Sequence, residues 1–239
     1  MKYICWFDQI TPENSGLVGG KNAALGTMVR ALKTIVAVPD GFAVTADAYR
    51  DFLTHNNLHK PIADLLDSIG NAQDIMHLSD AAQKIRNIIM QGDIPAAIAQ
   101  EISYAYQELG RRYGTSNIDV AVRSSATAED LPNASFAGQQ ESYLNISGVD
   151  ALIYAYQSCM ASLFTDRAIV YRIQNHFDHA SVAISVGVQK MVRSDCGAAG
   201  VAFSIDPQTG HPDMVVIEGA WGLGQMVVQG SIIPDTYMV

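Results

Sequence analysis

Residues 120–145 read VAVRSSATAEDLPNASFAGQQESYLN, and this stretch joins two predicted strands through a long run of small residues. Apolar residues alternate with others over residues 118–122, which predicts a strand that ends at Arg123. From Arg123 to residue 139 the chain is mostly Ser, Ala, Thr, Gly, Asn and Pro, and such a loop brings backbone N–H groups and hydroxyls to a polyanion. A second strand is predicted over residues 143–146. We therefore expect a phosphate-binding loop between two strands.

The overall composition restricts the class of protein. With 239 residues and 49% hydrophobic content, the chain can bury the core of one large domain or of two modest ones. Its net charge of -9 and pI near 4.9 argue against nucleic acid or an anionic membrane as the main partner. No apolar run approaches the length that a bilayer requires. An anionic ligand must therefore meet cations that are placed locally.

The cysteines and the first residues indicate the compartment. Cys5, Cys159 and Cys196 lie far apart and match no metal or redox spacing, which favours unpaired thiols in a reducing cytoplasm. The start, MKYICWFDQ, holds an apolar run too short for a signal peptide and predicts a first strand. We expect a cytoplasmic protein without a membrane partner.

A second cation lies at the start of a predicted helix in residues 15–33. Gly19, Gly20 and Lys21 precede an apolar helical face made of Leu25, Met28, Val29 and Leu32. A helix N-terminus offers unpaired N–H groups and a favourable dipole to an anion, so Lys21 is a natural phosphate ligand.

The pattern around Lys21 is not a Walker loop. Ser15 stands where that motif has its first glycine, and Asn22 stands where it has Ser or Thr. The segment alone leaves a second interpretation open, namely a glycine turn before a surface helix whose lysine is solvated.

The rest of the chain alternates helical and strand patterns. Helices are predicted over 45–53 with Thr45 as N-cap, over much of 62–112, over 150–163, and from the cap Thr165 to 175. Arg167 and Arg172 are expected to face solvent or to pair with acids.

Three further patterns lie in the last third of the chain. The pair His176 and His179 is interpreted as a helix end rather than as a metal site. Strands over 182–189, 198–205 and 214–217 predict an antiparallel meander. Gly222 and Gly224 lack the third glycine of a dinucleotide fingerprint, because residue 227 is Val227.

Seven segments carry a resemblance to a known family. In chain order they are VGGKNAALG, VPDGFAVT, VRSSATAEDLPNASFAGQQE, SLFTDRAIVYR, VQKMVRSD, GVAFSIDPQTG and WGLGQMVVQG. Together they resemble the amino-terminal nucleotide-binding domain of the phosphoenolpyruvate synthase family, in the wider group that includes pyruvate phosphate dikinase and rifampin phosphotransferase. The form FSIDPQTG after MVRSD is more similar to the synthases.

The resemblance implies an α+β chain with an ATP-grasp fold that is incomplete at its carboxyl end. We expect a first lobe of strand and helices over 1–117, and a phosphate loop with antiparallel sheet over 118–239. By the same resemblance, Lys21 and Arg123 bind the ATP phosphates and act in catalysis. The other expected nucleotide contacts are Gly138, Ser142, Gln189, Met191 and Val192.

The resemblance also implies a reaction. ATP phosphorylates a histidine in a separate domain, and the phosphohistidine then phosphorylates pyruvate, so that pyruvate, ATP and water yield phosphoenolpyruvate, AMP and phosphate. We expect no metal ligands within the chain, Mg²⁺ ligands and pyruvate-binding domains beyond Val239, and no activity of this chain by itself. A homodimer of the full-length protein is a further expectation. Gln225, where the family usually has Glu, weakens any metal or acid role there.

Three alternatives stay open at this point. The chain resembles, less closely, the ATP-binding domain of a rifampin phosphotransferase-like antibiotic kinase. It could also be a nucleotide-binding module without catalysis. The third alternative is that Lys21 and Arg123 are unrelated surface or ion-paired residues.

Overall fold

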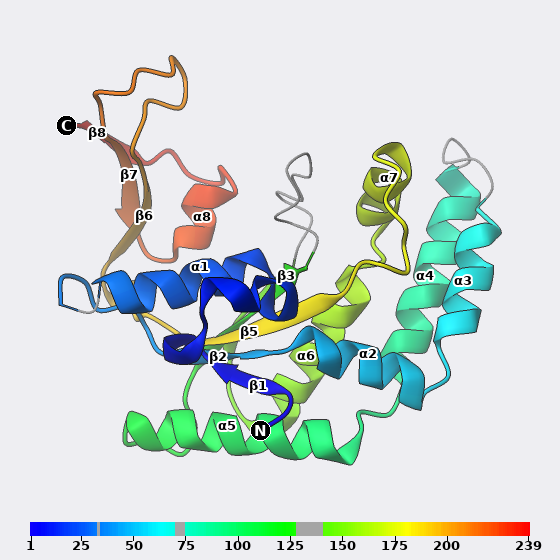
Figure 1. Ribbon diagram of the computed structural model, residues 1–239. Coiled ribbons are helices and arrows are strands. Elements are labelled where there is room, and N and C mark those ends of the chain that lie inside the picture. Colours follow the sequence, from blue (N-terminus) through cyan, green and yellow to red (C-terminus); the bar gives the residue numbers. More distant parts are fainter. Residues whose placement is uncertain (33, 70–74, 128–140) are drawn as a thin grey trace. The chain divides into compact units, whose positions relative to one another are not determined.

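A computed structural model describes residues 1–32, 34–69, 75–127 and 141–239 (Figure 1). The chain divides into two compact units, unit 1 over Met1–Met191 and unit 2 over Val192–Val239. Both units combine helices with antiparallel strands, which confirms the α+β class. The expected lobe boundary between 117 and 118 does not coincide with this division, because strands from both sides of it pair in one sheet of unit 1.

Unit 1 is organised around a five-stranded sheet in which every neighbouring pair is antiparallel. β5 lies at its centre between β2 and β3, and all of its residues up to Val188 are buried. The strands, in sheet order, are β1 (Ile4–Trp6), β2 (Gly41–Val44), β5 (Ile184–Lys190), β3 (Val120–Ala126) and β4 (Ser142–Ile146).

Helices cover both faces of this sheet. α1 (Ser15–Leu32) lies on one face, and α5 (Ala96–Arg112) and α6 (Val149–Ser162) lie on the other (Figure 1). Short 3₁₀ turns, η1 (Phe7–Gln9) and η2 (Pro12–Asn14), lead from β1 into α1. The remaining helices of unit 1 are α2 (Ala46–His55), α3 (His59–Asp67), α4 (Ile75–Gln91) and α7 (Asp166–Gln174).

The two faces of the sheet bury different kinds of side chain. The large core, which includes Phe52, Ile85, Ile102 and Tyr156, lies among α2 to α6. The core beneath α1 is small and is built from Phe7, Ile10, Val18 and Ala43. Small strand residues on the α1 face let that helix approach the sheet closely.

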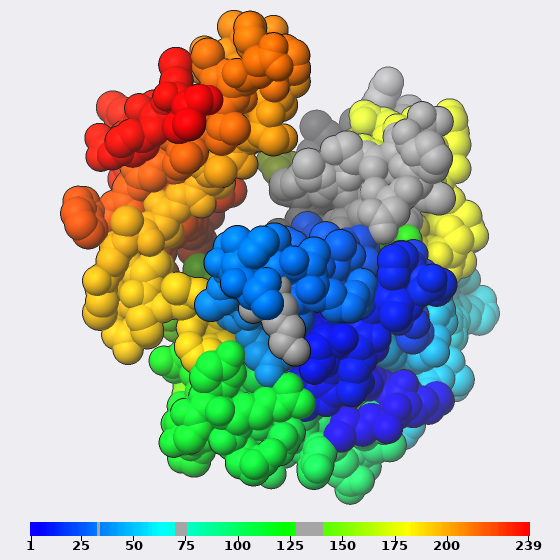
Figure 2. Space-filling view, turned by 60° about the vertical axis from the view of Figure 1, so that its left-hand side comes forward, coloured from blue at the N-terminus to red at the C-terminus, as the bar shows by residue number. Residues whose placement is uncertain are grey.

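Most predicted helices and strands are confirmed, but α1 packs differently from its predicted apolar face. Met28 is 45% exposed, whereas Val18, Asn22 and Gly26 are buried. A Cβ on Gly26 would come within 2.7 Å of the Ile10 side chain, so close helix approach selects glycine there. The atoms of α1, blue in the space-filling view, form part of the surface of unit 1 (Figure 2).

The predicted caps are confirmed in position and differ in chemistry. Thr165 precedes α7, and its Oγ1 accepts a hydrogen bond from the Ala168 N–H at 3.3 Å. Thr45 precedes α2 but makes no side-chain cap bond, and its buried Oγ1 has no partner among the described residues.

The predicted antiparallel meander is confirmed for the strands over 198–205 and 214–217, but the strand over 182–189 does not belong to it. β5 does not pair with the strand that follows it, because both of its edges are already occupied by β2 and β3. Residues Ser194–Cys196 form a 3₁₀ turn, η3, and a separate three-stranded sheet follows. Its elements are β6 (Ala198–Phe203), β7 (Val216–Trp221), α8 (Gly224–Val228) and β8 (Asp235–Met238), with sheet order β6-β7-β8.

Among the described residues, no helix has the length and apolar character that crossing a membrane would require.

Candidate functional site

A pocket of about 250 Å³ lies between α1 and the sheet of unit 1. It brings together three of the predicted site residues, Lys21 from α1, Arg123 from β3 and Gln189 from β5. Phe7, Leu25 and Met28 supply apolar wall, and Asn22, Ala24 and Gly187 complete the lining. We call this cavity the Lys21 pocket. The two cations on its wall suit an anionic ligand.

Strand register explains why these residues meet. Arg123 lies directly opposite Gly187, and Gln189 lies two residues farther along β5, so all three are on the α1 face of the sheet. Gly187 has no side chain to fill the space beside Arg123. The predicted strand end at Arg123 is therefore wrong: β3 continues to Ala126, and Arg123 is an exposed position between buried neighbours.

The buried side-chain amide of Asn22 fixes the part of α1 that carries Lys21. Asn22 is 1% exposed, and its Nδ2 donates to Val18 O at 2.9 Å and to Ser185 Oγ at 3.1 Å. The Ser185 hydroxyl in turn donates to Val44 O at 2.7 Å. A Cβ on Gly187 would lie 2.3 Å from Asn22 Oδ1, so this network needs glycine there. The network fixes the Lys21 end of α1 to β5 and β2.

Gly19 makes a second close contact between α1 and the sheet. Its φ of 72° lies in the left-handed region, and a Cβ would come within 2.5 Å of Ser125 O. The backbone N–H of Asn22 also approaches Ser125 Oγ at 3.5 Å. Gly19 therefore introduces a break in α1 at the point where this helix contacts β3.

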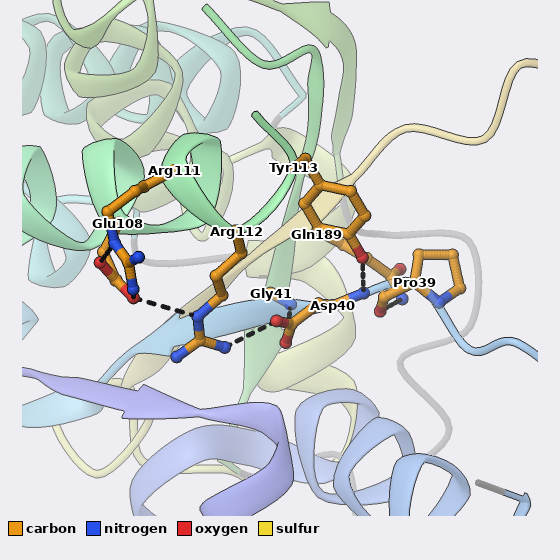
Figure 3. Close-up of polar contacts among 8 residues, drawn as sticks. All are labelled: Pro39, Asp40, Gly41, Glu108, Arg111, Arg112, Tyr113 and Gln189. Carbon is orange, nitrogen blue, oxygen red and sulfur yellow. Dashed lines mark hydrogen bonds and ion pairs between the residues drawn. The ribbon is translucent and has the colours of Figure 1, made fainter. Parts of the chain in front are cut away.

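The Gln189 side of the pocket is tied to the VPDG turn. Gln189 Nε2 donates to Pro39 O at 3.1 Å (Figure 3). The Lys190 N–H donates to Asp40 O at 2.9 Å. Within the turn, the Asp40 side chain accepts a hydrogen bond from the Gly41 N–H at 2.8 Å. These contacts set the position of the Gln189 amide.

An ion-paired arginine from α5 holds that turn in place. Arg112 Nη1 lies 2.6 Å from Asp40 Oδ2 (Figure 3). The Arg112 guanidinium also lies 3.7 Å from the Trp6 ring centroid. Glu108 bridges Arg111 and Arg112, and the hydrogen bond from Arg111 is the main cause that lowers the pKa of Glu108 to about 2.

The other predicted contacts lie in different places. Ser142 is exposed on β4 directly opposite Arg123, and Met191 follows β5 with its N–H donating to Asp119 O at 2.9 Å. Val192 is 58% exposed and belongs to unit 2. Gly138 falls outside the described residues. The role of each in nucleotide binding stays a prediction.

Sequence reasoning missed the residues that position the pocket. Asn22, Ser125 and Ser185 come from three separate segments of the sequence. Their role is visible only in the folded structure, where Asn22 donates hydrogen bonds to both serines. The available signal was the polarity of Asn22 and Ser185 within otherwise apolar patterns. Within the described ranges, no group of three or more His, Cys, Asp or Glu side chains could hold a metal ion.

Comparison with known proteins adds the family. A family model described as pyruvate phosphate dikinase, AMP/ATP-binding domain, matches residues 15–239. The chain belongs to this family. The matched region contains both cations of the Lys21 pocket and nearly all of units 1 and 2.

Relatives within the family are longer proteins. The phosphoenolpyruvate synthase of Helicobacter pylori is 51% identical over 240 residues, which cover 100% of this chain and 29% of that protein. The Aquifex aeolicus protein of the same name is 50% identical, covering 99% of this chain and 28% of its own length. The Escherichia coli protein of the same name is 46% identical over a region that covers 99% of this chain and 30% of that protein. The chain thus spans less than a third of each.

Proposed function

We propose that this chain is the ATP-binding part of a phosphoenolpyruvate synthase. The observation that carries this proposal is the meeting of Lys21, Arg123 and Gln189, which lie on three separate elements, in one pocket of a family member. The relatives compared carry the synthase name, and this favours the synthase over the antibiotic kinase alternative.

The two cations act on the phosphates of ATP. A guanidinium donates two parallel hydrogen bonds to phosphate oxygens, and an ammonium serves as a mobile point charge beside it. Charge that develops on the transferring phosphoryl group is stabilised by cations already in place, and this is usually the largest catalytic contribution. Asn22 and Gly187 hold Lys21 beside Arg123, so the site needs little rearrangement when ATP binds.

The pocket accounts for part of the nucleotide. At about 250 Å³ it is smaller than the roughly 300–1,000 Å³ of pockets that enclose a whole ligand. We assign the phosphate end to Lys21 and Arg123 and the adenine side to Gln189. An ATP-grasp fold, in which two lobes hold the nucleotide, supplies the remaining contacts in this proposal.

We assign no magnesium ligand to the described residues. ATP-dependent phosphoryl transfer uses Mg²⁺ held by carboxylates and phosphate oxygens. Among the described residues, no group of three or more His, Cys, Asp or Glu side chains could hold a metal ion. In this proposal, Lys21 and Arg123 are the charges that the described residues bring to the phosphates.

The complete protein would carry the phosphoryl group onward. In our proposal ATP phosphorylates a histidine outside this chain, and pyruvate then receives the phosphoryl group to form phosphoenolpyruvate, with AMP and phosphate released. We expect the 239-residue chain alone to form no AMP from ATP, Mg²⁺ and pyruvate. Sustained AMP formation, measured by chromatography, would contradict this expectation.

Titration of the chain with ATP tests the site itself. We expect Arg123→Ala to weaken ATP binding about 10- to 100-fold, because a hydrogen bond to a charged group contributes roughly 1.5–3 kcal/mol. Arg111→Ala is the matched control, since Arg111 is exposed on α5 and pairs with Glu108. Equal affinity for ATP in the two variants would overturn the assignment of Arg123. ATP binding by the unsubstituted chain without AMP formation would agree with that assignment.

A further inference from the structure

A second cavity, of about 380 Å³, lies in unit 1 away from the Lys21 pocket and shares no lining residue with it. α2 and α3 form two of its walls, and residues 178–183 between α7 and β5 form another. Leu53, Ile62 and Val182 supply apolar surface, and His179 supplies a polar group. We call this cavity the His179 pocket. Its volume falls within the roughly 300–1,000 Å³ typical of small-molecule sites.

A buried cation, Arg172, contacts residues that line this pocket. Arg172 was expected to face solvent or to pair with an acid, but it is 2% exposed, and no carboxylate of the described residues raises its pKa. Its Nε donates to His179 Nδ1 at 2.8 Å, and its guanidinium lies 5.4 Å from the Phe164 ring centroid. Both His179 and Phe164 line the pocket.

The charge of Arg172 is incompletely compensated. Its Nη2 is buried and has no hydrogen-bond partner among the described residues. Burial lowers the pKa of Arg172 to about 10, which leaves the side chain charged at neutral pH. A buried charge without a counter-ion costs several kcal/mol, on the order of the net stability of many domains. Such a charge is well placed to attract an anion.

The contact with Arg172 determines which nitrogen of His179 carries the proton. Because Nδ1 accepts the hydrogen bond from Arg172, the neutral ring carries its proton on Nε2. Burial, and then the charge of Arg172, lower the pKa of His179 to about 4, so the ring is neutral at pH 7. His179 therefore has an N–H donor at Nε2, while its Nδ1 accepts the hydrogen bond from Arg172.

Other charged groups line the pocket as well. Asp67 and Asp178 are exposed lining residues, and each influences the pKa of His179 less than Arg172 does. Arg50 pairs with Asp47 at 2.8 Å, and His59 Nε2 lies 3.2 Å from Thr54 Oγ1. Exposed carboxylates are screened by water, whereas the buried guanidinium is screened much less.

We propose that the His179 pocket binds a small oxyanion, the carboxylate or phosphate of a compact metabolite. The Nε2–H of His179 donates to the anion, Arg172 provides the fixed countercharge behind it, and the apolar walls accept the carbon part. This site is independent of ATP binding at the Lys21 pocket.

The test follows the His179 ring directly. The 239-residue chain, with ¹⁵N-labelled histidine, is titrated with inorganic phosphate and, separately, with succinate, while the imidazole resonances are recorded. We expect a saturable shift of the His179 resonance with at least one probe below about 10 mM. His179→Ala, followed by a thermal-shift titration, should weaken binding about tenfold or more. His176→Asn is the matched control, because His176 is exposed three residues away.

Two further variants separate this site from the phosphate-binding residues of the Lys21 pocket. Lys21→Met should leave the response of His179 unchanged. Ala63→Phe fills the pocket from its exposed side without removing the hydrogen bond between Arg172 and His179, and it should abolish binding. The proposal is overturned if neither probe shifts the resonance, if Lys21→Met abolishes the shift, or if Ala63→Phe binds as well as the unsubstituted chain.

Discussion

Asn22 and Arg172 are both buried polar side chains of unit 1, but they differ in how fully their polar atoms are hydrogen-bonded. Asn22 donates two hydrogen bonds, at 2.9 and 3.1 Å, and joins α1 to the sheet. Arg172 makes one hydrogen bond, at 2.8 Å, and keeps a buried Nη2 without a partner in the described part of the chain. A satisfied polar group stabilises its surroundings, whereas an unsatisfied cation lowers stability and requires another reason for its presence.

The same contrast separates the two pockets. In the Lys21 pocket the cations lie on exposed positions, and a neutral buried network places them. Next to the His179 pocket the cation, Arg172, is itself buried and donates a hydrogen bond to the lining residue His179. Stability measurements distinguish the two arrangements because removal of each group has a different expected cost.

The largest expected effect is the loss of the Asn22 network. Asn22→Ala removes two buried hydrogen bonds and leaves Val18 O and Ser185 Oγ without this donor, so we expect a loss of about 2–3 kcal/mol in the free energy of unfolding. Urea denaturation followed by circular dichroism measures it.

Asn175→Ala provides the control for that substitution. Asn175 Nδ2 also donates to a carbonyl four residues earlier, Tyr171 O at 2.8 Å, but in an exposed position. We expect a change within about 0.5 kcal/mol. Similar losses in both variants would contradict a special role for the buried amide.

A pH-dependent effect of intermediate size is expected from His179. Its pKa is lowered from 6.5 to about 4 in the folded chain, by burial first and then by Arg172. The unfolded chain binds a proton below about pH 6.5 while the folded chain does not, so this contribution to stability is complete above pH 6.5 and is lost as the pH falls towards 4.

We expect this loss to be about 1–2 kcal/mol at pH 4.5, after allowance for partial solvent screening. Urea denaturation at pH 7 and pH 4.5 measures it as the difference between the unsubstituted chain and His179→Gln. His176→Asn should keep the full dependence. If His179→Gln has the same pH profile as the unsubstituted chain, the low pKa of His179 is wrong.

The smallest expected change follows removal of the buried cation. Arg172→Met loses one hydrogen bond but also removes a charge that the described residues compensate poorly, so we expect stability within about 1 kcal/mol of the unsubstituted chain. Thermal and urea denaturation measure it. A loss comparable to that of Asn22→Ala would show that Arg172 is a structural residue and would remove the contrast.

Local patterns predicted much of the fold. The alternation in β3 and β5 and the helical spacing in α6 were sufficient because the large apolar side chains of each element follow its own period, even though small residues on the other face are buried too. Pairing between strands was harder to predict. The expected meander joined β5 to β6, yet β5 pairs with β2 and β3, whose residues lie far from it in the sequence.

The sequence by itself determined the α+β class and most helix and strand positions, because periodicities are local. Through the family resemblance it also predicted Lys21, Arg123 and Gln189 as nucleotide contacts, and these roles stay predictions. Only the tertiary structure placed these three residues in one pocket, since strand register and a glycine opposite Arg123 set their separation. It also decided that Arg172 is buried beside His179. The burial of a charged side chain depends on which segments pack around it, and that packing is a property of the whole unit.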